Sequence, residues 1–400
     1  MKLSIFLEQR MMRTKDNVVW SPAGYSEKFF GRYLTVFSHV TICARVIDVP
    51  VASTNSVRVN GDSVSVTAIP HYIGPWEFVR RKASIKNAVH SELAQTDAII
   101  IRVPSQIGWL AHASLVKNQR PYGVEVVGDP WEVFAKGGVS IPFRPFTRRL
   151  LTSRMRKQCA GASAAIYVTE DTLQQRYPSK ESSFSTYASD VELTSEAYLP
   201  EPRKYCGGEQ YRLIFVGSFA QMYKAPDVLV EAVSILLKGG YNVALTMLGD
   251  GVYRQKIMSM VKDLGLSSRI EFLGQVCSGS LVRNQLDRAD IFVMPSLTEG
   301  LPRAMVEAMA RGLPCVGSEV GGIPELLNPS EMVKPGDAVQ LAGKISELLL
   351  NPERMQRLSR ENITKARKYH SDVLMSRRND FYLALRDVTK DWNLRQTPLC

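Results

Sequence analysis

The sequence has no long hydrophobic run, no paired cysteines and no histidine cluster, and each absence excludes a class of protein. Only six of the 400 residues are cysteine, and no two form a CxxC pair, which argues against a disulfide scaffold. The five histidines lack the spacing of metal ligands. No stretch approaches the roughly 18 apolar residues of a membrane-spanning helix, and the first apolar run stops at Glu8, too early for a signal peptide. The expectation is a cytoplasmic protein with reduced thiols and no metal.

Acidic residues are the minority, with 39 Asp and Glu against 50 Lys and Arg, for a formal net charge of +11. The excess is concentrated in the first 200 residues, which hold 24 basic and 17 acidic side chains. A basic surface attracts nucleic acid, acidic lipid or phosphorylated ligands, and charge alone does not choose among them. No helix-turn-helix, zinc or RNP-type motif accompanies the charge, so no nucleic-acid partner is expected.

Short apolar runs alternate with longer amphipathic segments, most regularly in the second half. Runs such as LIFVG (213–217), VALTML (243–248) and IFVM (291–294) are typical of strands buried on both faces. Strands that alternate with helices of about 10–15 residues predict βαβ units and parallel sheets. The first half shows the pattern less regularly. A polar stretch with two prolines at 199–210 predicts a hinge between two domains.

The segment 291–318 combines a strand, a loop and a helix start with two glutamates. Glu299 lies in the loop, Pro302 leads into the helix, and Glu307 follows eight residues after Glu299. That spacing is on the order of 10 Å along a helix, so the two carboxylates can hold opposite ends of an elongated ligand. The free N–H groups at the helix start form an anion site. Taken alone, the glutamates also fit a helix-dipole charge and a solvated helix face.

Four motifs in this half resemble a known family. The stretch PSLTEGLPRAMVEAMARGLPCVGSEVGGIPEL (295–326) resembles the donor-site signature of family 4 glycosyltransferases of the GT-B fold, including the pair Glu299 and Glu307. FVGSFAQMYKAPDVLVEA (215–232), LGDG (248–251) and RIEFLGQV (269–276) resemble earlier parts of the same domain. The resemblance is close over 212–335 and rests on topology over the first 200 residues.

The resemblance implies an α/β fold with two Rossmann-like, doubly wound parallel-sheet domains that face a central cleft. We expect an acceptor-binding domain at 1–200 and a nucleotide-sugar-binding domain at 201–370. At 371–400 we expect a helix that packs back toward the first domain, followed by a tail.

The resemblance also implies roles for single residues. Glu299 would contact the donor sugar, Glu307 the ribose hydroxyls, and Lys224 the diphosphate leaving group. These roles agree with the chemistry, since hydroxyls donate to carboxylates and a fixed cation stabilises a departing diphosphate. The other donor-binding candidates are Ser218, Asp250, Gln275, Val276, Gly300, Leu301 and Pro302.

The chain departs from the family pattern at two positions. Many members have arginine where this chain has Ser218, so either Lys224 carries more of the phosphate charge or another base, such as Arg303, substitutes. Many also have a histidine at the end of a central strand in the first domain, where this chain has Asp129. Asp129 either orients or deprotonates the acceptor hydroxyl, as a third catalytic candidate beside Glu299 and Lys224, or caps the turn at Pro130.

Two segments of the first half are candidates for the acceptor side. Residues 144–157 carry six basic and no acidic side chains with apolar residues at helical spacing. Such a helix either lies on an anionic membrane surface or keeps its polar face in water. In the loop SPAGYSEKFF (21–30), Gly24, Tyr25 and Ser26 are acceptor-site candidates by position.

The resemblance implies a retaining glycosyltransferase that moves a sugar from a UDP- or GDP-sugar to a glycan or lipid-linked acceptor. Surface polysaccharide synthesis is the expected context. Neither a metal nor another cofactor is expected, and the location is the cytoplasm or the inner face of the cytoplasmic membrane. The alternatives are a non-catalytic GT-B scaffold of a polysaccharide assembly complex and a nucleotide-sugar epimerase. Nucleotide release that depends on an acceptor separates transfer from epimerisation.

Overall fold

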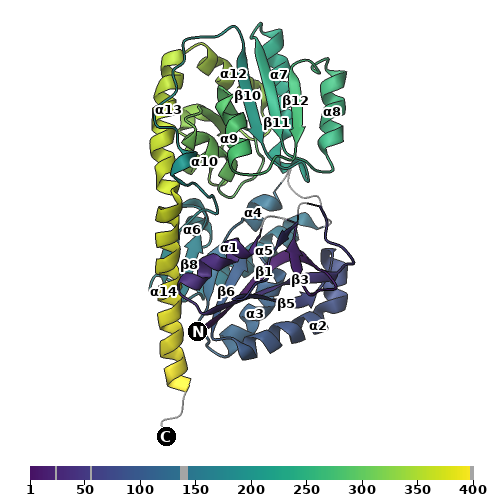
Figure 1. The fold of residues 1–400 in the computed structure, drawn as a ribbon, viewed down its shortest axis with the longest axis vertical. Helices are drawn as coiled ribbons and strands as arrows, with labels where there is room; N and C mark the ends of the chain where they lie inside the picture. The colour runs from purple at the N-terminus through teal and green to yellow at the C-terminus, as the bar shows by residue number, and fades with distance from the viewer. Residues whose placement is uncertain (23–24, 55, 136–142, 397–400) are drawn as a thin grey trace.

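A computed structural model describes residues 1–22, 25–54, 56–135 and 143–396. They form two α/β domains joined end to end, with the first domain in purple and blue and the second in teal and green (Figure 1). Each domain has one sheet with helices on both faces. The chain leaves the first sheet at Tyr187 and enters the second at Tyr211, so the predicted hinge at 199–210 lies between the two sheets.

The first domain contains a nine-stranded sheet. Seven of its strands are parallel, in the order β5-β3-β1-β6-β7-β8-β9. Two short strands, β2 and β4, extend from the end of β1 in an antiparallel ribbon at the edge of this otherwise parallel sheet, which has the predicted parallel arrangement. The strands are β1 (Lys2–Arg13), β2 (Val19–Ser21), β3 (His39–Asp48), β4 (Val57–Arg58), β5 (Val64–Pro70), β6 (Ala98–Val103), β7 (Gly123–Val126), β8 (Ala164–Tyr167) and β9 (Phe184–Tyr187).

The second domain contains a six-stranded, fully parallel sheet in the order β12-β11-β10-β13-β14-β15. Its strands are β10 (Tyr211–Val216), β11 (Val243–Leu248), β12 (Ile270–Gly274), β13 (Ile291–Met294), β14 (Cys315–Ser318) and β15 (Met332–Val333). The strand order reverses between β10 and β13, and ligands of such sheets bind outside the carboxyl ends of the strands at that point.

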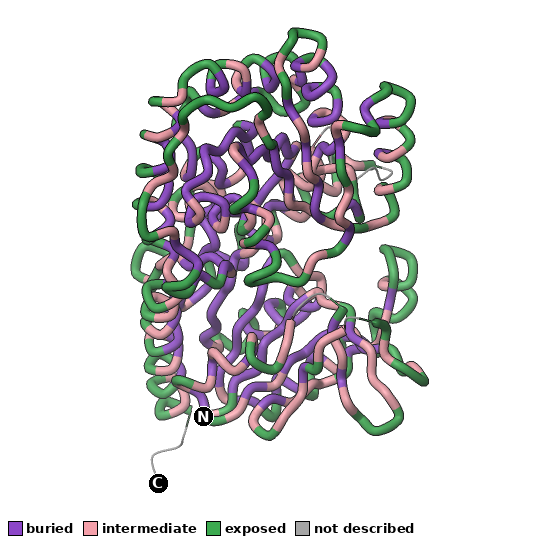
Figure 2. Tube along the Cα trace, turned by 45° about the horizontal axis from the view of Figure 1, so that its top comes forward, coloured by how far each residue is buried: buried purple, intermediate pink, exposed green. Residues whose placement is uncertain are grey.

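The strands form because their apolar runs are covered on both faces. Every residue of β6 and of β13 is buried, as parallel strands between two helix layers require. Figure 2 shows the buried chain running through the middle of each domain with exposed segments around it. In the helix α7 (Pro226–Lys238), a proline stands at the first helical position and one apolar face, including Leu229 and Val233, is buried.

The helices connect successive strands and cover the sheets. In the first domain they are α1 (Glu27–Gly31), α2 (Gly74–Gln95), α3 (Gln106–Lys117), α4 (Pro130–Val133), α5 (Arg144–Ala160) and α6 (Thr172–Arg176), with the 3₁₀ turns η1 (Arg32–Thr35) and η2 (Ser195–Ala197). In the second they are α7, α8 (Arg254–Asp263), α9 (Ser280–Asp287), α10 (Arg303–Ala310), α11 (Ile323–Leu326), α12 (Ala338–Leu349) and α13 (Pro352–Ala366), with η3 (Met222–Lys224), η4 (Pro329–Glu331) and η5 (Arg367–Tyr369).

The last helix, α14 (Ser371–Gln396), returns to the first domain, which confirms the predicted crossing helix. It runs along the outside of that domain, where it contacts β8, β9 and η1 (Figure 1). Its fully buried residues include Phe381 and Tyr382. In the part of the chain that the structure describes, no helix is both long and apolar enough to cross a bilayer.

Candidate active site

The predicted donor-site residues gather where the strand order of the second sheet reverses. Lys224 follows β10 through the turn η3, and Glu299 follows β13 in the loop before α10. Because β10 and β13 are neighbouring parallel strands, their following segments lie at the same edge of the sheet. Residues 75 positions apart in the chain therefore come into contact at this edge, which faces the first domain.

Lys224 and Glu299 form an ion pair at the centre of this edge. The Nζ atom of Lys224 donates to Oε1 of Glu299 at 2.5 Å, and the Ser296 hydroxyl donates to the same oxygen at 2.6 Å. The two charged side chains are only 14% and 6% exposed, so the pair is shielded from water. Removal of one partner from such a pair leaves an uncompensated buried charge.

The segment after Glu299 leads into α10 as the sequence predicts. Gly300, Leu301 and Pro302 form the approach, and Pro302 is the N-cap residue of α10. The first N–H groups of a helix lack partners within it and favour an anion. Arg303, the candidate second phosphate base, begins the helix with its side chain exposed.

Glu307 is half-buried on α10 and makes no side-chain hydrogen bond or ion pair with the residues that the structure describes. Burial raises the pKa of its carboxyl above the ordinary value, and the charges of Arg303 and Arg283 offset this in part. A half-buried acceptor with no partner among the described residues is suited to a hydroxyl donor from a ligand.

A glycine-lined turn borders the other side of the same edge. Gly249 has a φ of +133° and Gly251 of +151°, and a side chain at either position would clash with the backbone of the 217–220 turn. Ser218 is exposed, and its hydroxyl accepts the Ala220 amide at 3.1 Å. The exposed Asp250 accepts the amide of Gly251 at 2.7 Å. This turn therefore presents backbone and a hydroxyl rather than a second cation.

The residues predicted to border the nucleobase follow β12, the strand next to β11 at the edge of the sheet. Gln275 and Val276 directly follow β12, with Gln275 exposed and Val276 half-buried. The amide of Gly249 donates to the carbonyl of Gly274 at 2.8 Å, which links this strand end to the glycine-lined turn.

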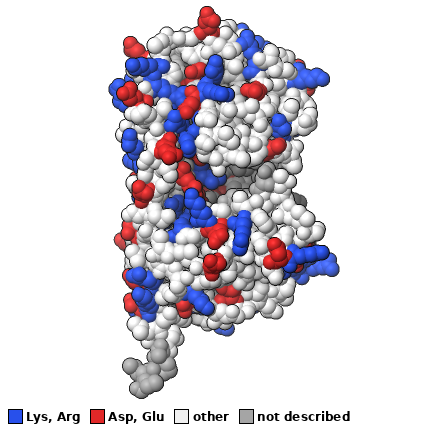
Figure 3. Space-filling view, viewed as in Figure 1, with Lys and Arg blue, Asp and Glu red and all other residues white. Residues whose placement is uncertain are grey.

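A cavity of about 210 Å³ lies between the domains and connects the donor candidates with the first domain. Figure 3 shows the surface indented between the two domains. Glu299 and Gly300 line the cavity on one side and Gly128 and Asp129 on the other. The sequence did not indicate the remaining lining residues, which are Val133, Gln221, Tyr223 and Thr298. The only available signal was proximity in the chain, of Gln221 and Tyr223 to Lys224, of Thr298 to Glu299 and of Val133 to Asp129.

Asp129 has the capping role that the sequence left as an alternative. It is the N-cap of α4, where its Oδ1 accepts the Trp131 amide at 2.8 Å and the Tyr177 hydroxyl at 2.5 Å. Its Oδ2 forms an ion pair with Arg176. Three donors therefore occupy a carboxylate that is 3% exposed, so these contacts account for it as a structural group. Its role toward the acceptor stays a prediction.

The acceptor-loop candidates are described in part. Tyr25 stacks on Phe30 with ring centroids 6.0 Å apart, and the Ser26 hydroxyl caps α1 by accepting the Phe29 amide. Gly24 lies outside the described residues. Local packing and capping therefore explain Tyr25 and Ser26 without reference to a ligand.

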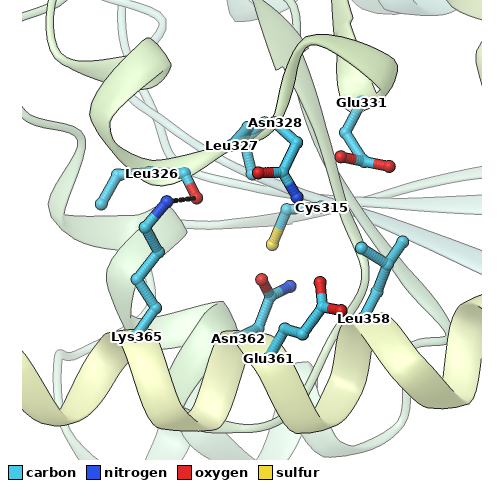
Figure 4. Close-up of a pocket in the computed structure, with 9 residues that line it drawn as sticks. All are labelled: Cys315, Leu326, Leu327, Asn328, Glu331, Leu358, Glu361, Asn362 and Lys365. Atoms are coloured by element: carbon cyan, nitrogen blue, oxygen red, sulfur yellow. Dashed lines mark hydrogen bonds between the residues drawn. The ribbon is translucent and has the colours of Figure 1, made fainter.

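A second cavity, of about 110 Å³, lies in the second domain near the amino end of β14, away from the predicted donor site. Figure 4 shows Glu331 above it and Glu361, Asn362 and Lys365 extending toward it from α13. Glu331 pairs with Arg354, although its Oε2 atom has no hydrogen-bond partner in the described part of the chain. Across residues 1–22, 25–54, 56–135 and 143–396, no group of three or more His, Cys, Asp or Glu side chains could hold a metal ion.

Comparisons with known proteins add to this geometry. Residues 210–351 match the family described as glycosyl transferases group 1. Protein CapJ from Staphylococcus aureus is 29% identical over 387 residues, which cover 92% of this chain and 95% of CapJ. The amylovoran biosynthesis glycosyltransferase AmsK from Erwinia amylovora is 39% identical over 134 residues, 31% of this chain and 33% of AmsK.

The fold is shared with solved structures. HepE from Anabaena, solved in complex with UDP and glucose, superposes with a TM-score of 0.66 at 15% identity. The superposition covers 96% of this chain and 99% of HepE. At that identity the likeness shows the fold alone, and it confirms the predicted GT-B arrangement of two Rossmann-like domains.

Proposed function

We propose that this glycosyltransferase, whose residues 210–351 match the family glycosyl transferases group 1, transfers a sugar with retention of configuration. The proposed donor is a UDP- or GDP-sugar, and the proposed acceptor is a glycan or a lipid-linked glycan. Surface polysaccharide synthesis is the proposed context, which the name of the partial relative AmsK supports. The observation that carries the proposal is the buried pair of Lys224 and Glu299 beside the interdomain cavity.

The leaving nucleoside diphosphate gains negative charge as the sugar departs, so fixed positive groups lower the barrier. We assign this task to the Lys224 ammonium and to the N–H groups at the start of α10. Since these groups supply positive charge themselves, we propose that no metal ion or other cofactor takes part. Glu299 would then accept hydrogen bonds from sugar hydroxyls while it fixes Lys224.

Retention is the part of the proposal that the family resemblance supports. Among the described residues that line the cavity, the carboxylates are Asp129, which three donors occupy, and Glu299, which pairs with Lys224. Neither is free to attack the sugar as a nucleophile. We therefore propose that the acceptor oxygen attacks from the face that the diphosphate leaves. One bond from the anomeric carbon to oxygen breaks, another forms, and the leaving phosphate takes the acceptor proton.

The remaining donor contacts follow from position. Glu307 would accept the ribose hydroxyls, Gln275 and Val276 would border the base, and Ser218 and Asp250 would lie beside the diphosphate. The main chain of Gly300, Leu301 and Pro302 would lie against the sugar and diphosphate.

We further propose that α5 holds the protein on an anionic membrane surface. Phe143, just before α5, and Phe146 and Leu150 within it are 82%, 68% and 37% exposed. Arg149 and Arg156 are exposed on the same helix. Exposed aromatic side chains next to basic ones suit the boundary of an anionic bilayer, where each basic residue contributes about 1 kcal/mol.

Co-sedimentation with phosphatidylglycerol vesicles tests this surface. Charge reversal of Arg149, Arg156 and Lys157 to Glu should abolish binding. The same reversal at Lys238, Lys256 and Lys262, three exposed lysines of the second domain, should leave most of it. Equal loss in both triple variants would contradict a specific membrane face.

Acceptor-dependent release of the nucleotide tests the transferase proposal. Purified protein is incubated with UDP- or GDP-sugars, with and without extracts of lipid-linked glycan, and free nucleoside diphosphate is measured. Release that requires both donor and acceptor is the expected result. Interconversion of the donor sugar without net release would favour an epimerase. Nucleotide binding without any turnover would favour a non-catalytic scaffold.

A further inference from the structure

The carboxylate of Glu325 connects the two domains. Glu325 lies on α11 of the second domain, and its partners lie in the first domain just after β8. Its Oε2 accepts the amide of Glu170 at 2.7 Å. Its Oε1 accepts the amides of Asp171 at 3.1 Å and Thr172 at 2.8 Å, and the Thr172 hydroxyl at 2.7 Å. One side chain therefore satisfies four donors of the opposite domain.

These donors include the free N–H groups at the start of α6. The N-cap residue of α6 is Asp171, and its side chain makes no capping hydrogen bond. The first N–H groups of a helix usually receive an acceptor from their own N-cap residue. Here the acceptor comes from the other domain, so α6 has its cap only while the domains are in contact.

The contact is reversible on physical grounds. Glu325, Glu170 and Thr172 are half-buried, and Asp171 is exposed. If the domains separate, water can solvate both the carboxylate and the amides. The hydrogen bonds therefore bias the position of one domain against the other without committing the chain to one arrangement.

Glu325 is also coupled to the loop that carries the Lys224 partner. The amide of Gly322 donates to the carbonyl of Gly300 at 2.7 Å. Gly321 has a φ of +53°, and a side chain there would clash with the carbonyl of Glu299. The segment from Gly321 to Glu325 thus joins the interdomain hydrogen bonds to the main chain of Glu299 and Gly300.

We infer that Glu325 is a positioning residue for sugar transfer, an inference that rests on the proposed function. It holds the first domain where Gly128 and Asp129 face Glu299 across the cavity. The nucleotide-binding candidates belong to the second domain alone, whereas transfer needs both domains. Loss of the carboxylate should therefore reduce the transfer rate and leave nucleotide affinity unchanged.

The test compares Glu325→Ala and Glu325→Gln with Glu353→Ala, which removes an exposed glutamate from the first turn of α13. Three quantities are measured: hydrogen–deuterium exchange of 168–176, nucleotide affinity, and the transfer rate at saturating donor. In Glu325→Ala we expect faster exchange of 170–172, unchanged affinity, and a rate lower by about tenfold, the change that about 1.4 kcal/mol produces. Glu325→Gln keeps one acceptor oxygen and should restore part of the rate.

Thr172→Val is a second variant of the same contact, which keeps the inference testable if the glutamate variants fail to fold. It removes the hydroxyl donor and keeps the three amide donors, so it should give a smaller loss in the same direction. Unchanged exchange in Glu325→Ala would show that the contact is absent in solution, and an unchanged rate with faster exchange would show that it does not position the domains. Either result overturns the inference. Absence of transfer by the parent chain would instead overturn the proposed function, and exchange would still report on the contact.

Discussion

Replacement of Glu307 should have opposite effects on stability and on nucleotide binding. Burial raises the pKa of this carboxyl, so its ionised form is disfavoured in the folded protein relative to the unfolded chain. Glu307→Gln removes the charge and keeps the shape. At neutral pH the ligand-free variant should therefore unfold at a higher temperature than the parent chain.

Nucleotide binding should change in the other direction. If Glu307 accepts two ribose hydroxyls, each hydrogen bond to the charged carboxylate contributes about 1.5 kcal/mol. Glu307→Ala removes both, so about 3 kcal/mol is lost and the dissociation constant rises about 150-fold. Glu307→Gln keeps one oxygen acceptor and should weaken binding about tenfold.

The stability gain should depend on pH with a defined sign. A carboxyl whose folded pKa is raised contributes stability below its unfolded value of 4.5, and that stability is lost as pH rises through the folded pKa. The advantage of Glu307→Gln should therefore be complete above the folded pKa and vanish as pH falls below the unfolded value.

The assay is thermal unfolding from pH 4 to 8, with and without nucleoside diphosphate. The matched control is Glu231→Gln, at an exposed glutamate in the middle of α7. A lower unfolding temperature for ligand-free Glu307→Gln would refute the burial argument. Unchanged nucleotide affinity in Glu307→Ala would refute the ribose assignment.

Three other predictions concern the residues around Glu299. Glu299→Ala should reduce transfer at least a hundredfold and leave nucleotide affinity within about threefold, since the nucleotide contacts lie elsewhere; normal turnover in this variant and in Glu307→Ala would contradict the site. An alanine in the left-handed conformation lowers the free energy of unfolding by about 1–2 kcal/mol. Gly265→Ala, at positive φ in open space, should lose that amount in denaturant unfolding, and Gly321→Ala should lose well over it. Equal losses would be inconsistent with the close approach of Gly321 to the Glu299 carbonyl. Asp129→Asn should lower the unfolding temperature and reduce transfer by less than tenfold, because its carboxylate is engaged by Arg176 and helix α4; a folded variant with a thousandfold loss would instead indicate an acceptor base.

The second domain could be predicted closely because its signals are local. The continuous apolar runs at 243–248 and 291–294 predicted strands, and they coincide with β11 and β13. The resemblance assigned Lys224 and Glu299 to one donor site, and the pairing of β10 with β13 brings them together at a common carboxyl edge.

The first domain and the contacts between domains were less accessible. The ribbon of β2 and β4 is short and lacks a long apolar run, so its sequence shows no periodic pattern that predicts strands. The partners of Asp129 lie 47 and 48 residues away in Arg176 and Tyr177, and those of Glu325 more than 150. Such pairings depend on how distant segments pack, and one sequence carries no pattern for them.

The central claim is that the edge formed by Lys224, Glu299 and Glu307 binds a nucleoside diphosphate. Thermal unfolding of the purified chain against UDP, GDP, ADP and inorganic phosphate tests it most directly. A ligand at 100 times its dissociation constant stabilises the fold by about 2.7 kcal/mol, which is readily measured. The account predicts a shift with UDP or GDP that Glu307→Ala reduces and free phosphate does not reproduce. No shift with any nucleotide, or an equal shift with phosphate alone, would contradict it.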